Sequence, residues 1–214
     1  MTIKSYVMKI SILFAIVLSL SFMSILTVKA DDAMPVPQAI VKDASDRILK
    51  AIKDNKAKLD ENPDEIYALV EQILMPNFDF DKMSKLALGK NWRGASESQQ
   101  QRFTEQFRLL LIRTYSTAML EYTDQEIRFL PFRDDVTTKK VKVDMEIIQV
   151  GGPSIPMALS MYQNDADEWK VYDVRIDGIS LVTNYRSTFT TQIRNEGMDK
   201  LIDSLANRNE KVKV

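Results

Sequence analysis

The chain has 214 residues, with 29 basic and 30 acidic side chains, so its formal net charge at pH 7 is −1. It contains no histidine and no cysteine, which excludes disulfides and the nucleophilic sites that depend on either side chain. The absence of both also removes the usual zinc ligands and the usual general base near neutral pH. An enzyme would have to rely on carboxylates, Tyr, Lys or Arg, and no grouping of these in the sequence is specific, so we predict no catalytic residues, no metal site and no cofactor.

The N-terminus has the pattern of a secretory signal peptide. Lys4 and Lys9 precede an apolar run over residues 10–26, and Val28-Lys29-Ala30 suits a signal-peptidase cut. An uncleaved membrane anchor is the alternative, because the run is near the lower length limit for spanning a bilayer. Cleavage at residue 30 removes three lysines and leaves 26 basic and 30 acidic residues. This balance argues against nucleic acid as a partner, because phosphate neutralisation needs a basic surface.

Four helices are predicted in the first half of the mature chain. Isoleucine or alanine recurs every four positions from Ile40 to Ile52, which is typical of one buried helical stripe. The caps and apolar spacing that follow predict helices over residues 62–75, 81–88 and 96–122. Asn62 is the expected cap of the second helix, and Gly89 is the expected end of the third.

The longest predicted helix begins at a capping box, in which Ser96 and Gln99 satisfy each other's backbone N–H groups. Bulky apolar residues from Phe103 to Tyr122 form a wide stripe along it. Such a stripe is typical of ordinary core packing, but part of it can also face a ligand cavity. Periodicity alone leaves both interpretations open.

The second half of the chain changes to a period of two. Strands are predicted over residues 126–132, 141–147, 157–161 and 169–176, joined by short turns, and helices over 180–196 and 199–206. We therefore predict an α+β fold in which helices pack on a curved antiparallel meander sheet of about four strands that encloses an apolar cavity. Residues 31–206 are expected to form a single domain, with a polar tail at 207–214.

The strand over residues 169–176 is unusually apolar. Simple alternation places Trp169 and Val171 on one face and Tyr172, Val174 and Ile176 on the other. A strand between one core and water has a single apolar face. This strand is therefore expected to be covered on both sides or to line a cavity.

Several segments resemble the MlaC family, also called the toluene-tolerance family, of periplasmic phospholipid-binding proteins. They span residues 78–93, 103–115, 169–189 and 197–199. The resemblance implies a soluble periplasmic carrier that holds phospholipid as cargo in an apolar pocket. It further implies shuttling between an outer-membrane lipoprotein complex and an inner-membrane ABC transporter with an MCE-domain subunit, which maintains outer-membrane lipid asymmetry.

The inferred inner faces of the helices and strands supply the candidate lipid-binding residues. They are Met83, Leu86, Leu110, Met119, Val143, Met145, Met157, Leu159, Tyr172, Val174 and Tyr185. Two alternatives stay open at this point. One is an isomerase-type enzyme that uses Asp173, Tyr172 and Tyr185, and the other is a structural envelope protein without a ligand.

Overall fold

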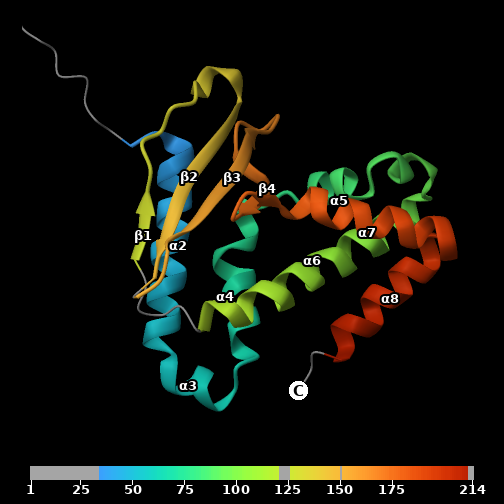
Figure 1. Ribbon diagram of the computed structural model, residues 1–214, viewed down its shortest axis with the longest axis horizontal. Helices are drawn as coiled ribbons and strands as arrows, with labels where there is room; N and C mark the ends of the chain where they lie inside the picture. Colours follow the sequence, from blue (N-terminus) through green and yellow to red (C-terminus); the bar gives the residue numbers. More distant parts are fainter. Residues whose placement is uncertain (1–33, 121–125, 150, 212–214) are drawn as a thin grey trace, which may run out of the picture. The chain divides into compact units, whose positions relative to one another are not determined.

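The computed structural model describes residues 34–120, 126–149 and 151–211, so the predicted signal peptide lies outside the described residues. Seven α-helices and five strands follow one another within these ranges (Figure 1). The helices are α2 (Val36–Asp54), α3 (Lys56–Glu61), α4 (Glu65–Ile73), α5 (Phe80–Leu88), α6 (Glu97–Leu120), α7 (Leu181–Glu196) and α8 (Met198–Lys211). Short 3₁₀ turns occupy Met75–Asn77, Gly89–Gly94 and Val136–Thr138.

Helix α6 is the longest and begins as predicted. The Gln99 backbone N–H donates to Ser96 Oγ at 3.2 Å, and the Ser96 N–H donates to Gln99 Oε1 at 3.0 Å. This reciprocal pair satisfies two N–H groups that the helix start would otherwise leave without partners. In Figure 1, α6 runs from α7 and α8 at one end to α4 at the other. This one helix therefore connects the C-terminal pair of helices with the N-terminal helices.

The sheet is an antiparallel meander in the order β1 (Glu126–Phe129), β2 (Lys140–Ile148), β3 (Ile155–Gln163), β4 (Trp169–Ile176) and β5 (Ile179–Ser180). The α+β class and the meander are confirmed. The two-residue β5 is an addition to the four predicted strands. It forms because Asp177 and Gly178 both have positive φ, 50° and 77°, which is the geometry of a tight hairpin turn.

Strand β4 contains a bulge that sequence alternation did not predict. Val174 pairs with Leu159 and Val171 pairs with Met161, so Tyr172 is an extra residue without a pairing partner of its own. A bulge changes the phase of alternation by one residue. Val171 and Val174 therefore share a face, and the predicted separation of these two valines is wrong.

Both faces of β4 are covered, as the sequence indicated. On the face opposite the two valines, Tyr172 packs edge-on against Tyr162 at a centroid distance of 5.9 Å. Asp79, which caps α5 by accepting from the Lys82 N–H at 2.8 Å, also accepts from the Tyr162 hydroxyl. Helix α5 thus contacts this outer face, and near β4 the sheet has helices on both sides rather than on one.

The remaining differences are the added helix α3 and the ends of several elements; strand β1, for example, ends at Phe129 instead of at residue 132. Helix α3 was not predicted, and α4 begins at Glu65 because residues 62–64 form a turn in which the Glu65 N–H donates to the Asn62 carbonyl at 3.2 Å. Helix α8 continues to Lys211, five residues past its predicted end. Asn209 explains the extension, because its buried side chain donates to the Gln106 carbonyl at 3.0 Å and holds this last turn against α6.

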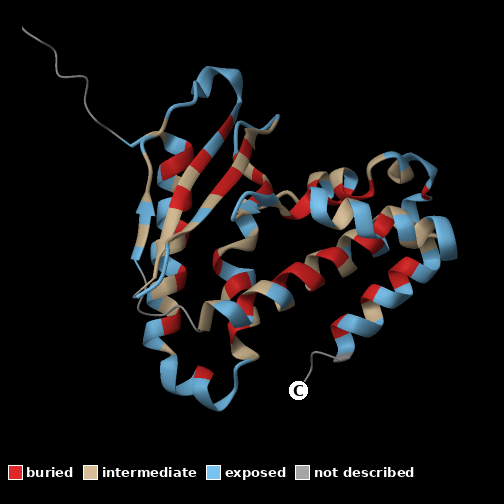
Figure 2. Ribbon diagram, in the orientation of Figure 1, coloured by how far each residue is buried: buried red, intermediate tan, exposed pale blue. Residues whose placement is uncertain are grey.

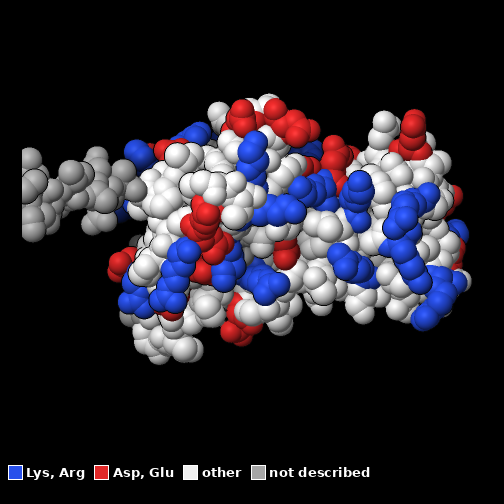
Figure 3. Space-filling view, turned by 90° about the horizontal axis from the view of Figure 1, so that it is seen from above, with Lys and Arg blue, Asp and Glu red and all other residues white. Residues whose placement is uncertain are grey.

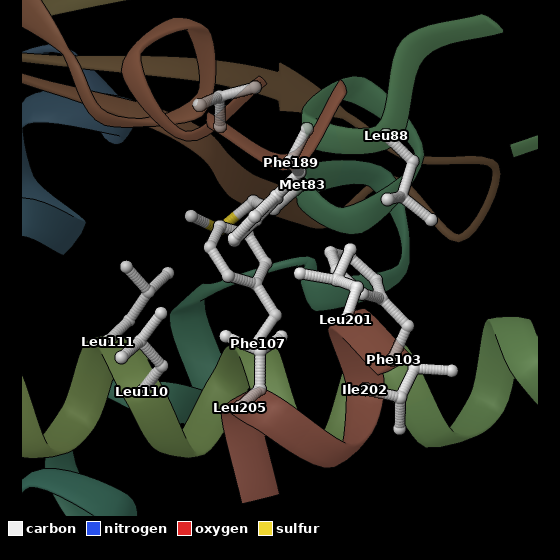
Figure 4. Close-up of a cluster of buried hydrophobic side chains, with 12 residues drawn as sticks. Met83, Leu88, Phe103, Phe107, Leu110, Leu111, Phe189, Leu201, Ile202 and Leu205 are labelled. Carbon is white, nitrogen blue, oxygen red and sulfur yellow. The ribbon is translucent and has the colours of Figure 1, made fainter. Parts of the chain in front are cut away.

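Most buried apolar residues in the described part of the chain belong to one of three clusters. Figure 2 shows the buried positions in red. The helical cluster joins α5, α6, α7 and α8 around Phe103, Phe107 and Phe189 (Figure 4). The sheet cluster lies on the inner faces of β2, β3 and β4, around Met161 and Val171. A third cluster joins α2, α3 and α4 to the second half of α6.

Candidate functional site

An apolar pocket of about 430 Å³ lies on the inner side of the sheet. One wall comes from β2, β3 and β4 through residues such as Met145, Leu159 and Val174. Helix α2 contributes seven residues between Ile40 and Ile52, and α6 contributes six between Leu111 and Met119. The pocket therefore lies between the sheet cluster and the cluster that joins α2, α3, α4 and α6, in the size range of small-molecule sites.

Among the described residues that line this pocket, none carries a charged side chain. The polar members of the lining are Ser45, Asn77, Tyr115 and Ser116. An ionised group would lose most of its hydration in such a place without gaining a counter-ion, which is strongly unfavourable. The pocket therefore suits a ligand, or the part of a ligand, that is mostly hydrocarbon.

Tyr115 lies where the pocket wall meets the helical cluster. Burial, together with the hydrogen-bonded neighbour Tyr185, raises the pKa of Tyr115 to about 12. The phenol therefore stays neutral at physiological pH. It adds no charge to the lining.

The exterior has the opposite character. Figure 3 shows Lys, Arg, Asp and Glu side chains distributed over the face it presents. Exposed ion pairs such as Lys42–Asp46 and Arg102–Asp199 connect many of these charges. Such pairs contribute little to stability, but a surface with both signs favours solubility.

Six of the eleven candidate residues line the pocket. They are Met83, Met119, Met145, Met157, Leu159 and Val174. Five of these six come from the sheet or from the last turns of α6, where the side chains predicted to face inward do line the pocket. Their contact with lipid stays a prediction.

The other five, Leu86, Leu110, Val143, Tyr172 and Tyr185, do not line the pocket. Leu110 belongs to the helical cluster, as Figure 4 shows, and Leu86 and Tyr185 pack against the same cluster. Val143 is fully buried within the sheet cluster.

Tyr172 is the fifth, and the bulge explains its position. As the extra residue of β4, it lies on the outer face with Tyr162. Val174, which shared its predicted face, lies on the inner face. Tyr172 and Val174, which simple alternation placed on one face, therefore lie on opposite faces of the sheet.

The α6 stripe divides along its length. Phe103, Phe107 and Leu110 pack into the helical cluster, whereas Tyr115, Ala118 and Met119 line the pocket. One half of the stripe therefore packs in the core and the other half lines the pocket, and contact of the second half with a ligand stays a prediction.

Sequence reasoning missed the contribution of α2. Its stripe of Ile40, Ala44, Ile48 and Ile52 was recognised as a buried face, but all four residues also line the pocket. Val171 and Ile176 of β4 were missed as well. The helical period gave a signal in α2, but a buried stripe does not reveal whether it faces side chains or a cavity.

The residues of the enzyme alternative are not brought together at the pocket. The Asp173 carboxylate accepts from Ser180 Oγ at 2.7 Å and from the Val182 N–H at 3.2 Å, at the start of α7. Tyr185 packs in the helical cluster, stacked on Phe189. Asp173 therefore has a structural partner at a helix start, where negative charge is favoured.

Two further properties concern only the described residues. Among them, no group of three or more acidic side chains is placed to hold a metal ion. The helices in the described ranges also lack the combination of length and apolar character that is needed to cross a bilayer.

Fold and site together define an α+β domain with an apolar pocket and a charged exterior. Comparison with known proteins agrees with this class, because residues 42–207 match the family described as MlaC protein. The chain belongs to the MlaC family.

Two curated relatives match most of the chain. The toluene tolerance protein ttg2D of Pseudomonas putida is 32% identical over 184 residues, which cover 85% of both chains. The intermembrane phospholipid transport system binding protein MlaC of Haemophilus influenzae is 23% identical over 171 residues, 79% of this chain and 80% of the relative.

A solved structure is also similar. It is the phospholipid-binding protein from Ralstonia solanacearum in complex with a phospholipid, with 30% sequence identity and a TM-score of 0.76. The match covers 83% of this chain and 99% of the other.

Proposed function

We propose that this protein binds phospholipid, with acyl chains held in the pocket between α2, α6 and the sheet. The observation that carries the proposal is a lining of carbon-rich side chains, with no charged group among its described residues. Relatives support it, since a similar protein from Ralstonia solanacearum is described in complex with a phospholipid. The six candidates that line the pocket are the proposed lipid contacts, joined by the α2 stripe and by Val171 and Ile176.

The energetics of lipid transfer fit a carrier rather than an enzyme. Each buried methylene group is worth about 0.8 kcal/mol relative to water, so two chains of about 15 methylenes gain roughly 24 kcal/mol. A phospholipid therefore hardly crosses an aqueous compartment unaided. Relative to a membrane, however, the pocket is another apolar phase, so exchange can be nearly balanced and needs no catalytic group.

Membership of the MlaC family supports a finer role, which is also part of the proposal. The chain is proposed to be exported by a cleavable signal peptide and to shuttle phospholipid through the periplasm. Its proposed partners are an outer-membrane lipoprotein complex and an inner-membrane ABC transporter with an MCE-domain subunit. The result would be the maintenance of outer-membrane lipid asymmetry, with phospholipid as cargo and not as a cofactor.

The binding proposal is tested by purifying the protein without detergent and analysing an organic extract by mass spectrometry. Phospholipid in a fixed ratio to protein is expected. An extract without lipid, combined with failure to take labelled phospholipid from vesicles, would overturn the proposal.

The transport role needs a separate measurement. Protein loaded with labelled phospholipid is mixed with acceptor vesicles, with and without the reconstituted inner-membrane complex. Transfer that depends on the complex supports the shuttle. Equal transfer to bare vesicles would contradict a dedicated partner.

A further inference from the structure

One buried polar atom in the described pocket lining has no hydrogen-bond partner. Ser116 in α6 is 1% exposed, and its Oγ finds no donor or acceptor among the described residues. Its neighbours along the helix face, Ile112 and Met119, also line the pocket. A buried hydroxyl without a partner is unfavourable, so an alanine at this position would suit a purely hydrocarbon ligand better.

The other polar side chains of the described lining have a hydrogen-bond partner or can reach water. The Asn77 amide donates to the carbonyls of Ile73 and Leu74, at 3.3 Å and 3.4 Å. The Tyr115 hydroxyl is hydrogen-bonded with Tyr185. Ser45 is partly exposed, so water can reach its hydroxyl. Within the lining, Ser116 is thus the residue that is both buried and without a partner.

We propose that the Ser116 hydroxyl donates a hydrogen bond to an ester carbonyl of the bound lipid, an inference that rests on the proposed phospholipid binding. The part of the lining that the structure describes has no charged side chain, so a phosphate placed against it would lose its hydration without compensation. An ester carbonyl is neutral, accepts hydrogen bonds and is joined directly to the acyl chain. It is the acceptor of a phospholipid that can follow the chains into such a pocket. Ser116 would then select esterified chains over purely alkyl chains.

The test is a competition between a diester phosphatidylcholine and its dialkyl ether analogue, which has the same headgroup and chain length but no carbonyl. Full-length protein is equilibrated with vesicles that contain both lipids in equal amounts, then isolated, extracted and analysed by mass spectrometry. The wild-type protein is expected to enrich the diester about two- to tenfold, the range of one neutral hydrogen bond. Ser116→Ala is expected to bring the bound ratio back to that of the vesicles.

Ser84 supplies a matched control. Its hydroxyl is likewise buried and without a partner, but the residue lies in α5 outside the pocket lining. Ser84→Ala should therefore keep the wild-type diester enrichment. Ser116→Cys, which keeps the size but weakens the donor, should give an intermediate ratio and provides a second variant if one of them folds poorly.

The outcomes separate the two proposals. If the wild-type protein binds both lipids equally, or if Ser116→Ala keeps the enrichment, the ester contact is overturned and phospholipid binding stands. If the wild-type protein takes up neither lipid, phospholipid binding fails, and the ester contact fails with it.

Discussion

Replacing Met145 by tryptophan should reduce lipid binding while leaving the fold intact. Met145 is 6% exposed at the centre of the sheet wall, paired with Phe129 on β1 and Met157 on β3. Its side chain lines the pocket, so a larger ring in its place enters space that is otherwise available to the ligand.

The size of the effect follows from the difference in bulk between the two side chains. A tryptophan ring at this position takes space that would otherwise hold about two to three methylene groups of the ligand, which costs about 2 kcal/mol at 0.8 kcal/mol each. This corresponds to about 25-fold weaker binding.

The assay measures phospholipid per protein by mass spectrometry, together with equilibrium uptake of labelled lipid from vesicles. Lys142→Trp is the matched control, because Lys142 lies on the same strand and its exposed side chain leaves the new ring in solvent. Circular dichroism and Tm verify that both variants fold. Wild-type lipid content in folded Met145→Trp would refute the assignment of this pocket to lipid.

Three further predictions concern stability. Ser96→Ala removes half of the capping box at the start of α6 and should lower stability by about 1 kcal/mol and Tm by about 2–4 °C, as followed by urea and thermal unfolding; an unchanged midpoint would show that the cap contributes nothing. Leu110→Ala should destabilise the helical cluster by about 2–5 kcal/mol, while the lipid content of the folded fraction stays at the wild-type level, because Leu110 does not line the pocket; a lower lipid content in folded protein would argue for a ligand contact. The third concerns pH. Since burial raises the pKa of Tyr115 to about 12 from 10.0, the folded state holds its proton more tightly than the unfolded state. The stability that Tyr115 contributes is therefore present below pH 10 and lost between pH 10 and pH 12, and Tyr115→Phe should lessen the fall in urea midpoint over that range; an identical fall in wild type and variant would contradict the assignment.

Local chemistry made the start of α6 and the sheet order predictable. The capping box of Ser96 and Gln99 requires only side chains three residues apart, and both hydrogen bonds are present. The Gly89 and Gly197 helix ends were likewise predictable, because both glycines have positive φ. The meander followed from short turns between strands of clear alternation.

The pocket was only half predictable, for two physical reasons. A buried stripe shows that residues avoid water but does not show what faces them, so Leu110 and Met119 looked alike on α6 although they face different surroundings. Strand alternation assumes an unbroken phase, which the extra Tyr172 interrupts. Ser116 gave no sequence signal, since a serine in a helix is usually exposed or bonded to its own backbone.

The bulge at Tyr172 has a consequence for insertions and deletions. Losing one residue from a strand normally moves every following side chain to the wrong face. In β4 the reverse is expected, because without Tyr172 the residues Trp169, Val171, Val174 and Ile176 fall into regular alternation on the inner face. A chain one residue shorter here would keep its pocket wall and lose the contact of Tyr172 with Tyr162. Length variation at this position can therefore change how the sheet is attached to α5 without changing what the pocket can hold.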